Sequence, residues 1–346
     1  MINLLIKILE IFTLDYIPRL PVQFRTKLYK TVLPLRKLRD SILLNKPKSQ
    51  FTFQDRIDFA RTSRVGYDYS GSRLIEYNQN VDFEKIENSE LEIYKFTPKN
   101  AKDDVYGIYF HGGGYYTGSV TSHKNIVSQF TNDLEMPFYF FEYKLTPEFN
   151  FPAAHDDAKK VVNFISGIEG NKQSIWMGES AGGGLATGIL VDDTFTISPD
   201  KLVLMSPWLD LSDKKRDRKY LRNKEILLAI DGVHWVGEHY SGDYEPNNPI
   251  LSPVFADIDN FPHTLIQVCS SELLYNDAIE FSNKLKNKKI EHELQISDDL
   301  WHAWQFFPIQ EAYDARKKIV SFVKDNSYSC LLYTSDAADE EDSVDL

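Results

Sequence analysis

The chain has 346 residues, of which 42% are hydrophobic, 13% aromatic and 26% charged. This is the composition of a globular protein, and the length suffices for one large α/β domain with insertions or for two domains. The net charge of −12 argues against nucleic acid as a partner.

The first sixteen residues are largely apolar but are interrupted by Lys7 and Glu10. This stretch is too short and too interrupted to span a bilayer. Its polar residues fall on a narrow stripe of a helix, so we expect it to pack over the rest of the protein. Contact of residues 1–16 with a membrane surface is the less favoured alternative. Residues 1–100 show mixed, mostly helical patterns and are predicted to form an N-terminal cap region.

From residue 101 to residue 329, short apolar strands alternate with helices. Strands are predicted at 104–110, 137–145, 174–178, 201–207, 264–268 and 291–297, and helices at 155–168, 180–191, 277–289 and 311–325. This alternation predicts an α/β fold with a mostly parallel central sheet and helices on both faces. Residues 212–250 form a helical-looking insertion that we expect near the pocket.

The last seventeen residues, 330–346, carry six acids and no base. Their opening residues resemble the translation of a transposase adapter from sequencing libraries, so we interpret them as a non-native read-through tail. A natural acidic, disordered tail is the alternative. Without Cys330, only Cys269 remains, so no intrachain disulfide can form and a cytoplasmic location is predicted.

The sequence GESAGGG at 178–184 is a G-x-S-x-G motif between a predicted strand and a predicted helix. A serine on so sharp a turn is exposed at the carboxyl end of the sheet. The helix that follows aims free N–H groups at the same place, and these groups favour negative charge. The context makes Ser180 a candidate nucleophile rather than an ordinary turn serine.

A glycine-rich loop, HGGGYYTG, occupies residues 111–118 directly after a predicted strand. Consecutive glycines allow the backbone to approach a ligand and to present N–H groups to it. Gly112 and Gly113, with Ala181 as a third group, are therefore candidate donors to an oxyanion. The alternatives are a plain glycine turn and, more weakly, a phosphate-binding loop, which the missing Gly-Lys-Ser/Thr disfavours.

The chain resembles the hormone-sensitive-lipase-like branch of the α/β-hydrolases over roughly residues 100 to 325. The resemblance rests on HGGGYYTGS, YKLTPEFNFPAAHDDA, GESAGGG, SPWLDLS and SELLYND followed by WHAW, in the family's order. It implies an α/β-hydrolase fold with an N-terminal cap, and a serine carboxylesterase that acts on small to medium acyl esters. Tyr115 and Tyr116 are then candidate substrate-binding residues. Glu179 departs from the family pattern, which more often has Asp there.

A serine hydroxyl needs a general base, and histidine suits neutral pH. In this fold the residues follow in the order Ser, then Asp or Glu, then His. Of the eight histidines, only His302 lies late enough and in a loop between the last strand and the last helix. The alternative is a core histidine flanked by aromatic residues. His111 is expected to brace the glycine-rich loop.

Two acids, Glu272 and Asp277, compete for the role of orienting His302. Glu272 directly follows an apolar strand, at the end of the sheet where Ser180 is expected. Asp277 starts a predicted helix and has a glutamate three positions later, which is typical of an N-cap. We therefore assign the triad acid to Glu272, where the family also has its acid, and expect Asp277 to cap the helix.

No metal-ligand cluster of convincing spacing and no cofactor motif is found in the sequence, so we predict hydrolysis of a small-molecule ester without a cofactor. The alternatives are a non-catalytic protein that binds a small ligand on the same fold, and a lipid esterase at a membrane interface. The sequence makes no prediction of the oligomeric state.

Overall fold

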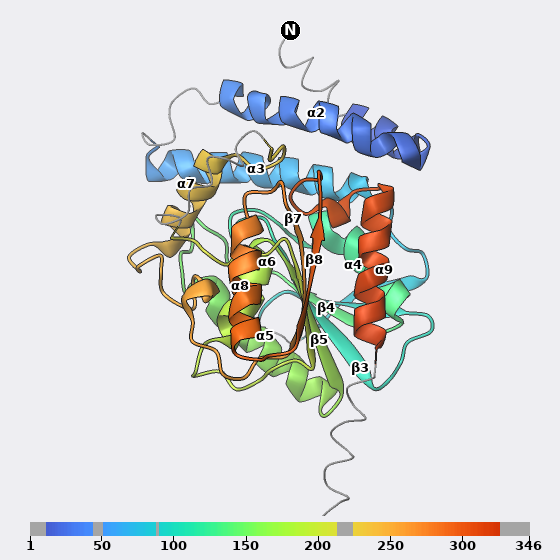
Figure 1. Ribbon diagram of the computed structural model, residues 1–346, viewed down its shortest axis with the longest axis vertical. Coiled ribbons are helices and arrows are strands. Elements are labelled where there is room, and N and C mark those ends of the chain that lie inside the picture. The colour runs from blue at the N-terminus through green and yellow to red at the C-terminus, as the bar shows by residue number, and fades with distance from the viewer. Residues whose placement is uncertain (1–11, 44–50, 88–89, 213–223, 326–346) are drawn as a thin grey trace, which may run out of the picture.

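A mostly parallel sheet runs through the centre of the computed structural model, which describes residues 12–43, 51–87, 90–212 and 224–325. Within these ranges, eight strands form one sheet in the order β1-β2-β4-β3-β5-β6-β7-β8 (Figure 1). They are β1 (Val81–Lys85), β2 (Ile93–Pro98), β3 (Val105–Phe110), β4 (Phe138–Phe141), β5 (Gln173–Glu179), β6 (Lys201–Met205), β7 (His263–Cys269) and β8 (His292–Ser297). Strands β3 to β8 run parallel, which confirms the predicted α/β architecture.

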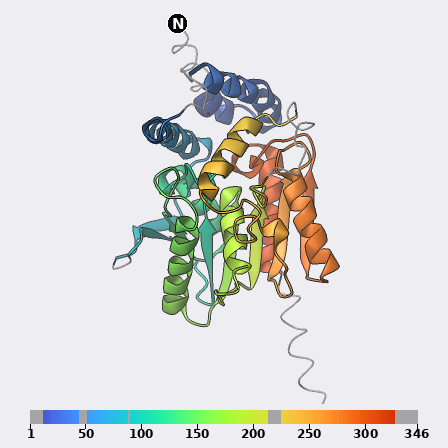
Figure 2. The ribbon, with the colours of Figure 1, turned by 90° about the vertical axis from the view of Figure 1, so that its left-hand side faces the viewer.

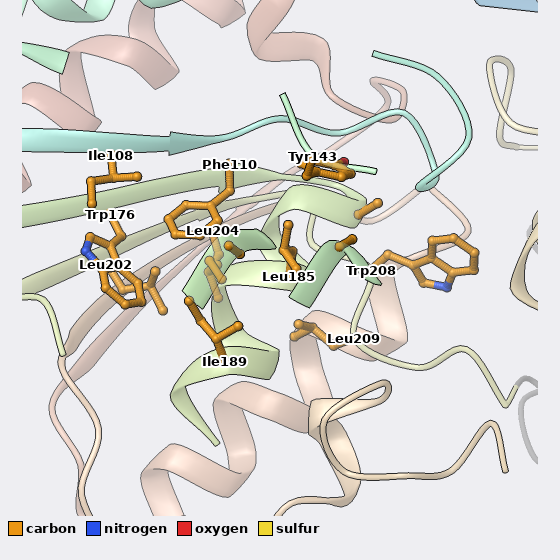
Figure 3. Packing of buried hydrophobic residues seen from close by; sticks show 14 of the residues in the cluster. Ile108, Phe110, Tyr143, Trp176, Leu185, Ile189, Leu202, Leu204, Trp208 and Leu209 are labelled. Carbon is orange, nitrogen blue, oxygen red and sulfur yellow. The ribbon is translucent and has the colours of Figure 1, made fainter. Parts of the chain in front are cut away.

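The central strands are buried on both faces, which explains why they read as continuous apolar runs rather than alternating ones. Successive side chains of a strand point to opposite faces. Ile108 and Phe110 of β3 therefore join the core on one face, and Tyr109 joins the core on the other. Figure 3 shows the first of these cores, where Leu185 and Ile189 of a helix approach the strand side chains.

Helices cover both faces of the sheet, as the alternating pattern predicts. On one face lie α4 (Val120–Leu134) and α9 (Gln310–Lys324), and on the other lie α5 (Ala153–Glu169), α6 (Ala181–Leu190) and α8 (Tyr275–Asn287). Helix α4 was not predicted. It begins at a capping box in which the Ser119 hydroxyl accepts from the backbone N–H of Ser122.

The N-terminal region lies across one end of the sheet (Figures 1 and 2). Two short helices, η1 (Phe12–Tyr16) and η2 (Ile17–Arg19), precede the long helices α2 (Val22–Leu43) and α3 (Phe53–Leu74). Residues 81–98 then enter the sheet as β1 and β2, antiparallel to each other and to β4. The expected cap region of 1–100 thus supplies two strands at one side of the sheet as well as covering helices. The sequence did not predict β1 because this exposed, charge-rich strand lacks the apolar run of a central strand.

The proposed read-through tail, 330–346, and residues 1–11 of the predicted N-terminal helix lie outside the described residues. The insertion contains α7 (Ile230–Ser241), followed by the short helix η5 (Pro253–Phe255), and a further short helix, η6 (Trp304–Phe306), precedes α9. Among the helices that the structure describes, none combines the length and the hydropathy needed to cross a membrane.

Candidate active site

Ser180 occupies the sharp turn between β5 and α6, as expected for a G-x-S-x-G serine. Its φ of 53° and ψ of −123° lie in a region that residues with a side chain rarely adopt. Backbone bonds hold it there, because its N–H donates to Met205 O at 3.0 Å and its carbonyl accepts from the Trp208 N–H at 2.9 Å. A Cβ at Gly182 would lie 2.0 Å from Phe110 O, so the helix can start this close to β3 only with glycine there.

Glu272 and His302 lie close together beyond the carboxyl ends of β7 and β8. Glu272 follows β7 and His302 follows β8, and His302 Nδ1 lies 3.2 Å from Glu272 Oε2. Both side chains are buried. Burial alone lowers the pKa of His302, but the neighbouring Glu272 carboxylate outweighs burial and holds that pKa above its ordinary value. Burial also raises the pKa of Glu272, against the opposing effect of His302.

Ser206, at the end of β6, connects these two residues. Its hydroxyl accepts a hydrogen bond from the backbone N–H of Ala303 at 3.1 Å, and its polarity opposes the burial that raises the pKa of Glu272. It therefore braces the loop that carries His302 and favours the charged form of the acid. Sequence reasoning missed it, although its position directly after a buried strand, within the quoted motif SPWLDLS, was a usable signal.

The four polar residues thus stand at one edge of the sheet. Ser180, Ser206, Glu272 and His302 follow β5, β6, β7 and β8, which are consecutive neighbours in the sheet. Because parallel strands all present their carboxyl ends at the same edge, residues far apart in the sequence come together there. The edge lies toward α2 and α3 (Figure 1).

The glycine-rich loop differs from expectation at Gly112. The Gly112 N–H donates to Glu179 Oε1 at 2.5 Å, so it is not available to an oxyanion, and its assignment as a donor is wrong. Among the described residues, the N–H groups of Gly113, Gly114 and Ala181 have no acceptor. The chain can turn its N–H groups outward here because Gly113 and Gly114 have φ angles of +110° and +66°.

His111 braces this loop, as predicted. Its Nδ1 lies 2.8 Å from Gly112 O, its ring stacks on Tyr143 with centroids 4.1 Å apart, and Tyr143 Oη donates to His111 O at 2.7 Å. Buried aromatic side chains therefore support the loop on the side that faces the core. Its exposed side faces α7, where Val236 Cγ1 would lie 3.5 Å from a Cβ placed on Gly114.

Residues 107–306, more than half of the chain, match a family described by the α/β-hydrolase fold. The chain belongs to this α/β-hydrolase family. An esterase of Acinetobacter venetianus is 29% identical over 62% of this chain and 73% of its own length. An acetyl-hydrolase of Streptomyces hygroscopicus is 29% identical over 58% of this chain and 68% of its own.

Solved structures agree with these relatives. A hormone-sensitive lipase from a metagenome library is 26% identical with a TM-score of 0.75, covering 85% of this chain and 96% of the other. A second metagenomic homologue of hormone-sensitive lipase is 27% identical with a TM-score of 0.71, covering 79% and 98%. The protein is therefore a carboxylic ester hydrolase of the hormone-sensitive-lipase-like branch, as its motifs indicated.

The two tyrosines of the glycine-rich loop of this hydrolase lie in different surroundings. Tyr115 is fully buried in the core and stacks on Tyr240 of α7 with ring centroids 3.8 Å apart, so its expected contact with substrate is wrong. Tyr116 instead lies between α3 and α7, near Phe59 and Trp235, and its hydroxyl donates to Arg56 O. The two adjacent side chains therefore join different hydrophobic clusters, and the sequence did not predict which one would enter the main core.

Asp277 does not cap α8. The helix begins at Tyr275, because the chain already winds into a turn in which the Tyr275 N–H donates to Glu272 O. The buried Asp277 carboxylate instead accepts from the backbone N–H groups of Leu209 and Asp210, at 3.1 and 3.0 Å. The predicted N-cap is therefore wrong, and Asp277 braces the loop that follows β6.

The described residues contain no group of three or more His, Cys, Asp or Glu side chains arranged to hold a metal ion. The site combines a strained serine, a buried imidazole bound to a carboxylate, and backbone N–H groups that have no acceptor in the described part of the chain.

Proposed function

We propose that this esterase hydrolyses small to medium acyl esters through an acyl-enzyme on Ser180. The observation that carries the proposal is the buried Glu272–His302 pair at 3.2 Å, on the same sheet edge as the strained Ser180 turn. A histidine needs an orienting partner to serve as base to a serine hydroxyl, and Glu272 supplies one.

In the first half of the reaction, Ser180 Oγ attacks the ester carbonyl carbon while its proton passes to the imidazole of His302. The carbonyl oxygen becomes an oxyanion, which accepts from the N–H groups of Gly113, Gly114 and Ala181. The C–O bond to the alcohol then breaks, and the imidazolium returns the proton to the departing alcohol oxygen. Glu272 orients the ring and stabilises its charged form throughout.

In the second half, a water molecule gives a proton to His302 and attacks the acyl carbon. A second oxyanion forms at the same donors and collapses, breaking the bond to Ser180 Oγ. The imidazolium returns its proton to that oxygen, which releases the carboxylic acid and restores the enzyme. The role of the donors is electrostatic: they are already oriented before the charge develops, so no reorganisation is needed in the transition state.

Short acyl chains are the expected substrates. The acetyl-hydrolase name of the Streptomyces relative supports this expectation, as does the burial of Tyr116, from the glycine-rich loop, between α3 and α7. We also retain the cytoplasm as the proposed location, supported by Cys269, which is free and buried.

Hydrolysis of p-nitrophenyl esters from acetate to palmitate tests the function. We expect the wild type to prefer the short end of the series and Ser180→Ala to lose activity across it. Ser198→Ala, which changes an exposed serine in the loop after α6, is the matched control and should keep full activity. A wild type inactive on every ester, and unlabelled at Ser180 by a fluorophosphonate, would leave a small-ligand-binding protein as the better description.

A further inference from the structure

Glu179, the residue directly before Ser180, lies at the centre of a buried hydrogen-bond cluster. Its Oε1 accepts from the Gly112 N–H at 2.5 Å and lies 2.8 Å from His123 Nε2, while its Oε2 accepts from the Tyr109 hydroxyl at 2.8 Å. None of these groups has a part in the mechanism above. We propose that Glu179 and His123 act together as positioning residues for the oxyanion hole, a role that rests on the esterase mechanism proposed above.

Because Glu179 fixes the Gly112 N–H, it sets the orientation from which the chain continues into Gly113 and Gly114, whose N–H groups have no acceptor among the described residues. The contact is close, since a Cβ at Gly112 would lie 2.7 Å from Glu179 Oε1. A displaced Gly112 would therefore carry the two donors with it.

Glu179 is bonded covalently to Ser180 and is hydrogen-bonded to the loop that carries the donors, 67 residues earlier in the chain. One side chain thus ties the attacking oxygen to the groups that receive the negative charge. Catalysis depends steeply on such relative placement, because the donors must lie about 2.7–3.1 Å from the oxyanion.

A buried carboxylate close to the oxyanion hole opposes the negative charge that develops there unless a cation neutralises it. His123 is placed to be that cation. Its Nε2 faces the Glu179 carboxylate and its Nδ1 lies 3.1 Å from Ser119 O, and both of these partners can only accept hydrogen bonds. The Ser122 hydroxyl, 3.0 Å from Nδ1, itself donates to Ser119 O.

A protonated imidazole satisfies both acceptors, whereas either neutral tautomer leaves one of them facing a lone pair. Burial by itself lowers the pKa of His123, but the Glu179 carboxylate, followed by the Ser119 carbonyl, outweighs it and holds that pKa above its ordinary value. The pair is thus close to neutral as a whole, so Glu179 can hold the loop without repelling the oxyanion.

Two conservative substitutions separate position from charge. Glu179→Gln keeps a side-chain oxygen for Gly112 but removes the charge that holds His123. His123→Gln keeps a donor to Glu179 but leaves the carboxylate unneutralised. We expect each to lower kcat by about 10- to 100-fold, less than the loss of an oxyanion donor, with KM little changed. The double variant should recover part of the activity that His123→Gln loses, because it carries no unbalanced charge.

The decisive readout is a trifluoromethyl ketone of short chain length. Ser180 Oγ adds to its carbonyl carbon, the serine proton passes to His302, and the ketone oxygen becomes a stable oxyanion in the hole. We expect the inhibition constant to rise in each single variant by the factor by which kcat/KM falls. A role confined to folding would lower the thermal unfolding temperature without producing this proportionality.

Asp192→Asn is the matched control. Asp192 is also a buried carboxylate, and it too binds one basic side chain, one backbone N–H and one hydroxyl: those of Lys159 and Thr194, beyond the far end of α6. We expect its substitution to affect stability while leaving kcat and the inhibition constant at wild-type values.

The outcomes are distinguishable from failure of the proposed function. An inactive wild type that forms no ketone adduct overturns the esterase mechanism itself. An active wild type whose single variants retain the inhibition constant of Asp192→Asn, or whose double variant is slower than His123→Gln, overturns only the role of the pair. If one single variant does not fold, the other single variant and the double variant, compared with the control, still decide.

Discussion

The Glu272 carboxylate holds His302 with the help of groups from neighbouring strand ends. His302 Nδ1 lies 3.2 Å from it, the Cys269 N–H lies at the longer distance of 3.4 Å, and the polarity of Ser206 helps to lower its pKa. A buried carboxylate remains useful only while such partners stabilise it, because burial disfavours its charge. The position directly after the strand is therefore what makes this acid suitable for its proposed role.

The substitution Glu272→Gln tests whether this carboxylate orients His302. We expect kcat to fall by about 10³- to 10⁴-fold, as when a triad acid is replaced by its amide. His302 must be neutral to accept the serine proton, so activity is lost as the pH falls through the pKa of His302. That pKa is raised in the wild type. The acid limb of the kcat/KM profile should therefore move to lower pH in the variant.

The measurement is the pH dependence of kcat/KM for a p-nitrophenyl ester. Glu245→Gln, at an exposed acid, serves as the control and should retain the wild-type profile. An unshifted acid limb with near-normal turnover in Glu272→Gln would mean that another group orients His302.

The loop after β6 connects the turn of Ser180 with the loop of His302. Its Trp208 N–H donates to Ser180 O, and its Ser206 hydroxyl accepts from Ala303 N–H. Asp277, from the first turn of α8, binds the N–H groups of Leu209 and Asp210. A helix that covers the sheet thereby holds a loop that touches both the nucleophile turn and the histidine loop.

Asp277→Ala should be more destabilising than loss of a helix cap. Its removal leaves two buried N–H groups without this acceptor, and each such group costs about 1–3 kcal/mol. We therefore expect the free energy of unfolding to fall by about 2–6 kcal/mol, measured by urea titration, with the exposed Asp193→Ala as the control. A loss of only about 1 kcal/mol would instead match an ordinary N-cap.

In the molecule as a whole, Arg64 attaches helix α3 to two loops of the catalytic domain. Arg64 of α3 donates to Tyr116 O and Thr146 O, each at 3.0 Å, and forms a forked pair with Glu148 at 2.8 and 2.7 Å. The charges are partly exposed, so the ion pair itself contributes little. The bonds to two backbone carbonyls fix where α3 lies over the glycine-rich loop.

Arg64→Lys should loosen this attachment, because an ammonium group cannot reproduce the guanidinium fork. We expect KM for short p-nitrophenyl esters to rise while kcat changes less, and limited proteolysis within α3 to become faster. Arg61→Lys, at an exposed position on the same helix, is the control. If the two variants have the same KM and the same proteolysis rate, Arg64 does not hold the cap in place.

The sequence alone was sufficient for features that depend on local pattern. The alternation of apolar strands and helices predicted the parallel sheet, and the strand–turn–helix context singled out Ser180. Chain order and proximity to strand ends led to Glu272 and His302, which the structure brings together. These inferences worked because parallel strands present their carboxyl ends at one edge whatever the detail of packing.

Only the tertiary structure decided how particular groups point. The Gly112 N–H turns to Glu179, the Tyr115 ring turns into the core, and Asp277 reaches a loop nearly seventy residues earlier. The pairing of β2 with β4 likewise joined part of the expected cap region to the sheet. Each outcome depends on hydrogen bonds or packing between residues far apart in the chain, and a local pattern carries no information about which distant partner satisfies a buried polar group.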